Sequence, residues 1–273
     1  MVVNHCLAAC GSGQRISLLN TLAFWQRGQL RCGIHLALRH GFVVMNTPRT
    51  AVGPIKAVIF DMDGLLLDTE GIYSDVTQIV VERYGRTYDW SIKQHIIGRG
   101  AQDLAEYIVN ALDLPITWQT FLREREPLMA ERFSKALGMP GAEELVRHLK
   151  AHSIPIAVGT SSSSSGFGYK TTLHREWFAL FDTIVTADDP EVGAAKPAPD
   201  IFLTAARRLG IAPEDCLVFE DSPFGVTAAK AANMTAIAVP DAAMVDSKYH
   251  HADLIIRKLA EFDLGTYGLP PLR

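Results

Sequence analysis

The stretch Lys56–Gly71, KAVIFDMDGLLLDTEG, joins a short apolar run to two aspartates, Asp61 and Asp63, which one residue separates and a glycine follows. An apolar run of this length without polar alternation is typical of a strand buried in a parallel sheet. Two carboxylates at the end of such a strand repel each other, and each is costly to bury without a compensating charge. The stretch therefore predicts a site that holds a positive charge at the end of a buried strand.

Further apolar runs of the same kind alternate with helical patterns along the chain. The predicted strands are residues 55–60, 154–160, 182–187, 216–221, 235–240 and 252–257, and the predicted helices between them are residues 141–152, 199–210 and 222–233. Asn233 ends the last helix at a position that often needs a left-handed backbone, which Asn tolerates. Buried strands separated by helices predict a doubly wound α/β core around a parallel sheet.

The segment of residues 69–137 breaks this alternation, because it shows helical patterns and no convincing strand. Its predicted helices are residues 73–85, 101–112 and 118–137. We interpret the segment as an all-helical cap inserted into a core that consists of residues 51–68 and 138–273. An insertion at this point lies over the carboxyl ends of the strands, where ligands bind in open α/β sheets.

The composition, 48% hydrophobic and 21% charged over 273 residues, fits one large domain or a domain with a smaller insertion. The net charge of -4 hides an asymmetry, because residues 1–50 contain five arginines and no Lys, Asp or Glu. The rest of the chain is acidic and lacks the basic surface that nucleic acids or anionic membranes require. We therefore expect a monomer that binds a small molecule, with no nucleic-acid or membrane partner.

The first fifty residues differ in character from the rest of the chain. An arginine-bearing, acid-free segment is typical of an organellar transit peptide, which residues 1–44 would then form. The interpretation that we favour is that Met45 is the true start, since the first predicted strand begins ten residues later. Residues 1–50 are then an extension that is disordered or not translated.

Cysteine usage indicates the cellular compartment. The four cysteines, Cys6, Cys10, Cys32 and Cys216, are too few and too scattered for a disulfide framework. They are typical of free thiols in a reducing environment. Without a transit peptide, the expected location is the cytoplasm.

Polar groups that match the two aspartates follow other predicted strands. They are Thr160 after the second strand, Lys196 after the third, and Glu220 with Asp221 at the end of the fourth. The carboxyl ends of parallel strands meet at one edge of a sheet, so these groups form one predicted site. Oxygen ligands without histidine or thiol favour Mg²⁺. A calcium loop of the EF-hand type is excluded, because Gly64 stands at the fourth position of the motif instead of the sixth.

A serine-rich stretch, SSSSSGFG at residues 161–168, directly follows the strand that ends at Thr160. Low-complexity serine and glycine are typical of a flexible linker. The position after a strand equally favours a loop at the edge where the site lies. Both interpretations stay open from the sequence.

Four segments, in this order, resemble the motifs of the haloacid dehalogenase superfamily of phosphohydrolases, in its branch with a helical cap after the first strand. They are DMDGLLLDTE (61–70), GTSS (159–162), KPAPD (196–200) and VFEDSPFGV (218–226). The resemblance covers about residues 55–262. It implies that Asp61 is a nucleophile that forms an aspartyl phosphate, and that Asp63 first protonates the leaving alcohol and then activates water.

The resemblance also implies how the phosphate and the metal are held. Lys196, Thr160 and the amide of Ser161 would bind phosphate oxygens. The Mg²⁺ ligands would be the Asp61 carboxylate, the main-chain carbonyl of Asp63, and Asp221. Glu220 would be a further ligand or would support the others.

Segments outside the motifs resemble a narrower group, the pseudouridine 5'-phosphatases and the similar glycerol-3-phosphate phosphatases. They are residues 64–70, 128–149, 186–192 and 267–272, the last being YGLPPL. The implied substrate is a small phosphorylated metabolite: pseudouridine 5'-phosphate, glycerol 3-phosphate or a sugar phosphate. A phosphomutase similar to β-phosphoglucomutase is the alternative, and a binding protein with a relic site is disfavoured because every charged motif position is filled.

The cap is expected to select the substrate through the segment IIGRG, which contains Gly98 and Arg99. Arg99 can contact an anionic or hydroxylated leaving group. A solvated arginine in a connection between helices is an equally good interpretation.

Overall fold

The computed structural model describes residues 53–97 and 99–272. The interpretations given for residues 1–50, with Met45 as a start, and the role suggested for Gly98 lie outside the described residues. Within them, no helix combines the length and the apolar character that crossing a membrane requires.

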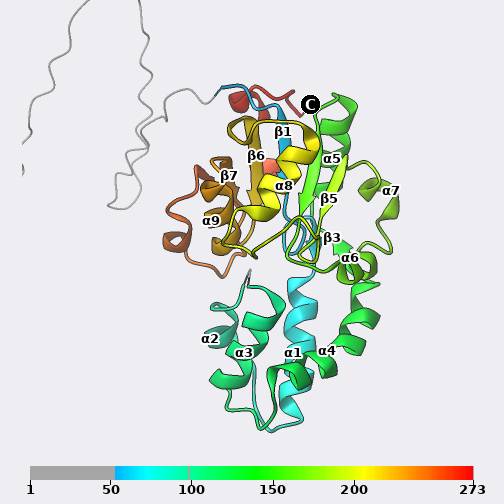
Figure 1. Ribbon diagram of the computed structural model, residues 1–273, viewed down its shortest axis with the longest axis vertical. Helices are drawn as coiled ribbons and strands as arrows, with labels where there is room; N and C mark the ends of the chain where they lie inside the picture. The colour runs from blue at the N-terminus through cyan, green and yellow to red at the C-terminus, as the bar shows by residue number, and fades with distance from the viewer. Residues whose placement is uncertain (1–52, 98, 273) are drawn as a thin grey trace, which may run out of the picture. The chain divides into compact units, whose positions relative to one another are not determined.

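Among the described residues, the central element is a six-stranded sheet in the order β5-β4-β1-β6-β7-β8 (Figure 1). Its strands are β1 (Ala57–Phe60), β4 (Ile156–Gly159), β5 (Thr183–Val185), β6 (Cys216–Glu220), β7 (Thr235–Ala238) and β8 (Leu254–Ile255). Every neighbouring pair is parallel. In sequence order, β1 is the first strand of the sheet, β4 and β5 extend the sheet on one side of it, and β6, β7 and β8 extend it on the other. The doubly wound α/β prediction is confirmed.

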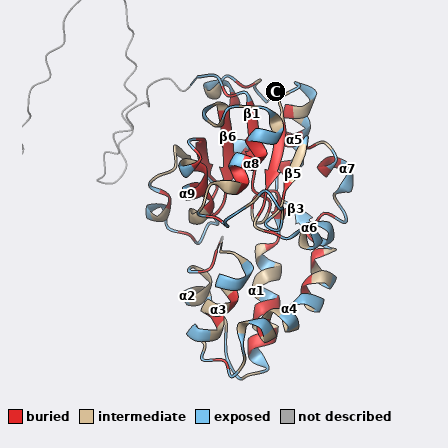
Figure 2. Ribbon diagram, in the orientation of Figure 1, coloured by how far each residue is buried: buried red, intermediate tan, exposed pale blue. Residues whose placement is uncertain are grey.

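Helices cover both faces of this sheet. In β1, Val58 and Phe60 pack into one apolar cluster, and Ala57 and Ile59 pack into a second. The first cluster includes α5 (Ala142–Ala151) and α7 (Arg175–Phe178), and the second includes α8 (Asp200–Leu209) and α9 (Pro223–Ala231). Figure 2 shows the strands buried between these layers. Burial on both faces explains why the strands lack polar alternation.

The helix ends follow the local sequence. Gly210, with φ 69°, caps α8 in the left-handed region, and Asn233 has φ 62°, as predicted. In the serine-rich stretch, the Ser163 hydroxyl accepts a hydrogen bond from the Gly166 amide at 3.2 Å and caps α6 (Ser164–Lys170). The stretch is therefore a short strand-end loop followed by a helix, and the linker interpretation is wrong.

The cap consists of α1 (Glu70–Glu82), α2 (Trp90–Lys93), α3 (Ala101–Ala111) and α4 (Trp118–Phe133). These helices share an apolar cluster that includes Val80, Ile108 and Phe121. The inserted helical cap is thus confirmed as part of the fold. The boundaries that we assign to it, residues 69 and 137, stay a prediction.

Two short strands that the sequence did not predict connect core and cap. β2 (Leu67–Asp68) and β3 (Leu137–Gly138) pair antiparallel, so the chain enters and leaves the cap at adjacent points. The helix expected to reach residue 137 ends at Phe133 instead. Two-residue strands carry no periodicity, so the hydrophobic pattern could not reveal them.

Short 3-10 helices complete the core: η1 (Pro213–Asp215), η2 (Asp246–Tyr249), η3 (Leu259–Glu261) and η4 (Leu264–Tyr267).

Candidate active site

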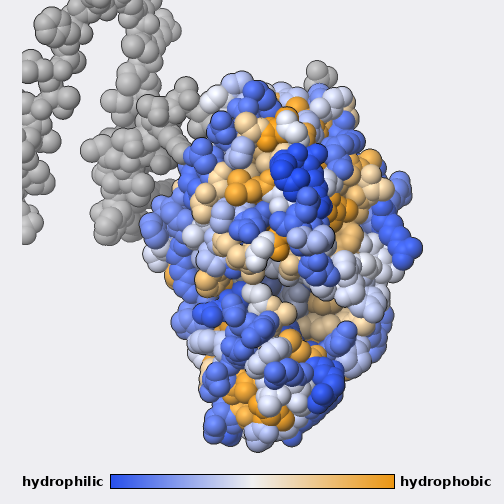
Figure 3. All heavy atoms as spheres, in the orientation of Figure 1, coloured by the Kyte–Doolittle hydropathy of each residue, from blue (hydrophilic) through white to orange (hydrophobic). Residues whose placement is uncertain are grey.

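Of the predicted site residues that the structure describes, all except Thr160 line a cavity of about 620 Å³ at the ends of the strands, and Thr160 is fully buried beside it. Asp61 follows β1, Thr160 follows β4, and Glu220 ends β6, which pairs with β1. The cavity is lined on one side by these strand ends and on the other by cap helices. In the view of Figure 3 the surface is hollowed between the sheet and the cap helices.

Lys196 joins two buried carboxylates. Its Nζ donates hydrogen bonds to Asp61 Oδ1 at 2.6 Å, to Glu220 Oε1 at 2.6 Å and to the Gly159 carbonyl at 3.0 Å. Asp61 and Glu220 raise the pKa of this lysine, although burial acts in the opposite direction. Lys196 is therefore charged and compensates part of the negative charge of both carboxylates.

A third carboxylate leaves this cluster with an excess of negative charge. Oxygen atoms of Asp61, Glu220 and Asp221 lie within 4.8 Å of one another. Both Glu220 oxygens already accept hydrogen bonds, one from Lys196 and the other from the Ser222 amide at 2.8 Å and hydroxyl at 2.9 Å. The Asp221 carboxylate accepts none from the residues that the structure describes. Its oxygens are the ones that still need a positive partner.

The raised pKa values of the Asp61 and Asp221 carboxyl groups also indicate that a positive charge is needed beside them. Burial raises the pKa of Asp61 to about 7, with contributions from Glu220 and Asp63 that the charge of Lys196 does not cancel. Burial and the neighbouring charges of Glu220 and Asp61 raise the pKa of Asp221 well above its ordinary value. A divalent cation between Asp61 and Asp221 would compensate this repulsion, and an all-oxygen donor set fits Mg²⁺.

Two glycines make room for the carboxylates. A Cβ on Gly225 would lie 1.7 Å from Glu220 Oε1, which Lys196 holds in place. Gly64 has φ 78°, and a Cβ there would lie 2.5 Å from Asp221 Oδ2. Glycine at both positions is therefore part of the site's construction.

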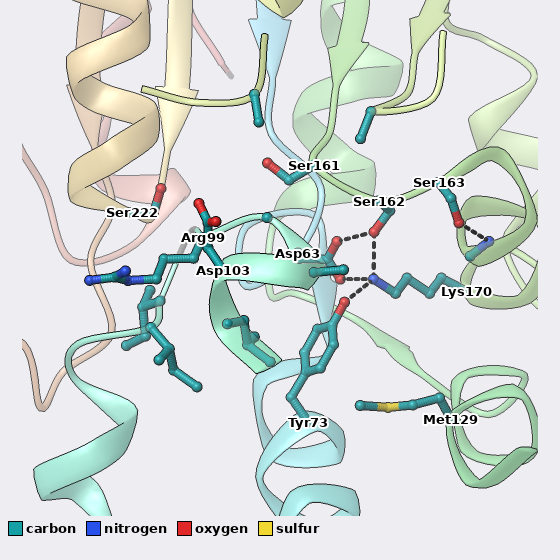
Figure 4. Close-up of a pocket in the computed structure, with 18 of the residues that line it drawn as sticks. Asp63, Tyr73, Arg99, Asp103, Met129, Ser161, Ser162, Ser163, Lys170 and Ser222 are labelled. Atoms are coloured by element: carbon teal, nitrogen blue, oxygen red, sulfur yellow. Dashed lines mark hydrogen bonds and ion pairs between the residues drawn. The ribbon is translucent and has the colours of Figure 1, made fainter. Parts of the chain in front are cut away.

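Asp63 lies in a separate group of hydrogen-bond donors (Figure 4). Its Oδ1 accepts from Thr69 Oγ1 at 2.7 Å and from Lys170 Nζ at 2.5 Å. Its Oδ2 accepts from Ser162 Oγ at 2.8 Å, and Thr160 Oγ1 lies 3.5 Å away. The ammonium group of Lys170 can only donate, and the hydroxyl groups can donate as well, so these contacts favour the ionised form of Asp63.

Lys170, which is not among the predicted site residues, favours the ionised form of Asp63. Its Nζ also donates to Tyr73 Oη at 2.6 Å and Ser162 Oγ at 2.7 Å, and the residue is 1% exposed. Burial alone would raise the pKa of Asp63, but the charge of Lys170 and the hydrogen bonds outweigh it and lower the pKa. The signal in the sequence is that the segment after the serine-rich stretch resembles the pseudouridine 5'-phosphatase group around Lys170, but this resemblance assigns Lys170 no role.

The remaining predicted residues lie around the same cavity. Ser161 and Arg99 both line it. The Arg99 side chain extends away from the Asp63 group (Figure 4), with its guanidinium carbon 5.2 Å from the ring centroid of Tyr107 and 5.5 Å from that of Phe224. A contact between Arg99 and a leaving group stays a prediction.

An α/β core whose strand ends bring together an aspartate pair, a buried lysine and an acidic pair defines a class of phosphoryl-transfer enzyme. The family described as haloacid dehalogenase-like hydrolase matches residues 58–239. The chain belongs to this family and is a phosphatase within it.

Two relatives cover most of the chain. A protein of Drosophila melanogaster named "Probable pseudouridine-5'-phosphatase" is 44% identical over 215 residues, which are 78% of this chain and 93% of the relative. A protein of Arabidopsis thaliana named "(DL)-glycerol-3-phosphatase 2" is 44% identical over 224 residues, 80% of this chain and 93% of the relative.

Among solved structures, a haloacid dehalogenase family hydrolase from Deinococcus radiodurans with bound phosphate and sodium superposes with a TM-score of 0.65. It is 28% identical, and the match covers 81% of this chain and 100% of that one.

Proposed function

We propose that this phosphatase hydrolyses a small phosphorylated metabolite through an aspartyl phosphate on Asp61, with Mg²⁺ as cofactor. The observation that carries the proposal is the state of Asp61: Lys196 holds its Oδ1 at 2.6 Å, and Oδ2 has no hydrogen-bond partner among the described residues. A carboxylate fixed by one oxygen, with the other available, is a competent nucleophile for phosphorus.

In this proposal each group at the strand ends has one task. Lys196, the Thr160 hydroxyl and the Ser161 amide bind the phosphate oxygens, and Asp61 and Asp221 hold the cation, with the main-chain carbonyl of Asp63 as a further ligand. Glu220 orients Lys196. The cation, when bound, neutralises negative charge on the transferring phosphoryl group.

Asp63 is proposed to donate a proton to the leaving alcohol when the aspartyl phosphate forms, and to accept a proton from water when the aspartyl phosphate is hydrolysed. In the free protein Lys170 keeps it ionised. The approach of a phosphate dianion adds a like charge, which raises the pKa of Asp63 and favours its protonated form when the leaving alcohol needs a proton. After the alcohol has left, the ionised carboxylate accepts a proton from the attacking water.

The candidate substrates are pseudouridine 5'-phosphate, glycerol 3-phosphate and sugar phosphates, supported by the names of the relatives and by the size of the cavity. The test is release of inorganic phosphate from a panel of these compounds. Glucose 1-phosphate belongs in the panel, because its conversion to glucose 6-phosphate without phosphate release would identify a phosphomutase instead. Absence of phosphate release from every compound would refute the proposal.

Removal of the metal is expected to abolish activity, and Mg²⁺ is expected to restore it. Protons compete with the cation for Asp61 below its pKa of about 7 in the metal-free protein. The Mg²⁺ concentration for half-maximal activity should therefore stay constant above that pH and rise by about tenfold per pH unit below it for each proton displaced. Activity that persists in protein shown by metal analysis to be metal-free would contradict the proposed cofactor.

Replacement of Lys170 by methionine is expected to lower kcat by about 100-fold, a typical effect of disturbed proton transfer. Because Lys170 lowers the pKa of Asp63, its loss should move the corresponding limb of the pH–rate profile to higher pH. The matched control is Lys135→Met, whose side chain is 74% exposed. A lower rate with an unshifted profile would mean that Lys170 serves packing and not Asp63.

A further inference from the structure

Arg125 is a buried cation that has neither a hydrogen bond nor an ion pair within the part of the chain that the structure describes. The residue is 5% exposed and lines the cavity from α4. Its Nε is the one buried side-chain nitrogen or oxygen atom among the described residues that has no hydrogen bond. No ion pair joins Arg125 to an acidic group in that part of the chain. Buried charges in proteins are ordinarily paired, so this guanidinium needs an explanation.

The arginine interrupts an apolar stripe of the cap. The four buried residues of α4 recur every four positions: Phe121, Arg125, Met129 and Phe133. At this spacing they share one face of the helix, so Arg125 stands where the packing pattern calls for an apolar side chain. Arg125 therefore does not belong to the solvent-exposed face of α4, where charged residues are ordinarily found.

The surroundings of Arg125 are aromatic. Its guanidinium carbon lies 5.2 Å from the ring centroid of Phe121 and 5.7 Å from that of Tyr73. Ring faces stabilise the cation but offer no acceptor in the plane of its N–H groups. The guanidinium therefore keeps a planar set of donors that an anion can satisfy.

Tyr73 lies between Arg125 and the group of residues around Asp63, and contacts both Arg125 and Lys170. The tyrosine hydroxyl accepts a hydrogen bond from Lys170 at 2.6 Å, and Lys170 in turn contacts Asp63. One aromatic side chain thus separates Arg125 from the Asp63 group, and both line the same cavity of about 620 Å³. This volume exceeds what a phosphate alone occupies and suits a small metabolite.

We propose that Arg125 binds a second anionic group, a carboxylate or a phosphate, on the leaving group of the substrate. The inference rests on the proposed function, since it assumes that the phosphate to be cleaved lies at Asp61. It narrows the small metabolites of the proposed function to phosphomonoesters whose leaving group carries a second anion, and so ranks pseudouridine 5'-phosphate and glycerol 3-phosphate, whose leaving groups are uncharged, below them.

The test uses two pairs of substrates that differ in the second anion: sorbitol 6-phosphate with 6-phosphogluconate for a carboxylate, and glucose 6-phosphate with glucose 1,6-bisphosphate for a phosphate. For at least one pair, kcat/KM of the wild-type protein should favour the compound with the second anion by about tenfold or more, as expected for a charge-assisted bidentate contact. Arg125→Met should reduce this ratio to about one.

The control is Arg123→Met on the same helix, because Arg123 is exposed and bonds Thr120 Oγ1 at 3.1 Å outside the cavity. It should leave the ratio unchanged. Equal wild-type rates within both pairs, or a ratio that survives Arg125→Met, would overturn the inference while leaving the proposed function intact. If Arg125→Met does not fold, Arg125→Lys keeps the charge without the planar donors and should still lower the ratio several-fold; an unchanged ratio would overturn the inference.

A binding measurement separates the two proposals. Calorimetric titration of 6-phosphogluconate and sorbitol 6-phosphate into the Asp61→Asn protein, with and without Arg125→Met, needs no turnover. If the wild-type protein hydrolyses no phosphomonoester, the proposed function fails, and the titration still decides the anion site. Tighter binding of 6-phosphogluconate that Arg125→Met removes supports that site, and equal binding refutes it for a carboxylate; glucose 1,6-bisphosphate is the corresponding probe for a phosphate.

Discussion

The Asp61→Asn protein is expected to fold normally, bind substrate and lose turnover by a factor on the order of 10⁴ or more. The amide nearly matches the carboxylate in size but is no nucleophile. The Lys196 contact at 2.6 Å survives through the amide oxygen, so the geometry around Glu220 is retained. Loss of activity with an unchanged fold would therefore report on the chemistry.

Steady-state phosphate release and circular dichroism measure the two parts of this expectation. Asp75→Asn, an exposed carboxyl change on α1, is the matched control and should retain full activity. Full activity in Asp61→Asn, with mass spectrometry showing that the amide has not reverted to the acid, would exclude Asp61 as the nucleophile.

The Lys196→Met protein is expected to be both inactive and strongly destabilised. The substitution leaves Asp61 and Glu220 buried without their cation, and loss of one partner of a buried pair typically costs about 3–5 kcal/mol. For a domain of this size, that loss corresponds to a fall in Tm of roughly 10 °C. Thermal unfolding of the metal-free protein measures it without interference from bound Mg²⁺.

The pH dependence of this loss identifies its cause. Burial already raises the pKa of Asp61 to about 7 with the lysine present, and without it the pKa rises further. Protonation at low pH then removes one buried charge, so the destabilisation should be smaller near pH 6 than near pH 8.

The control for Lys196 is a lysine on the surface. Lys56→Met breaks an exposed pair with Asp215 at 2.7 Å, which solvent screens, and should leave the Tm almost unchanged at either pH. An equal loss for Lys56→Met and Lys196→Met would contradict the account of Lys196 as the neutralising group.

The core and the position of the candidate site at one edge of its sheet could be predicted from the sequence, because both depend on local patterns. Strands buried on two faces appear as uninterrupted apolar runs, and Asp61, Thr160 and Asp221 directly follow such runs. Parallel pairing then brings the strand ends together whatever their separation along the chain. The resemblance to the family motifs implied roles for these residues, which their spacing alone did not supply.

Lys170 and Arg125 could not be assigned from the sequence, because their positions depend on helices from different parts of the chain. Lys170 lies in α6 and meets Asp63 across 107 positions of sequence. Its helix begins in a stretch whose composition resembles a loop. Arg125 lies among other charged residues in α4, and only the four-residue spacing of its buried neighbours indicates that it points inward. Contacts between side chains of elements that are distant in the sequence have no periodic signature.

The pairing of β2 with β3 makes it possible to replace the helical cap between them by the cap of a related protein. Leu67 lies opposite Gly138 and Asp68 lies opposite Leu137, so the two points where the segment begins and ends are direct neighbours. Excision of residues 69–136 would leave ends that a turn of about two residues can join, with little loop-closure entropy to overcome. The segment is thus a replaceable module on a constant catalytic platform, and grafting a helical segment from a relative at these two positions should transfer substrate preference without rebuilding the sheet.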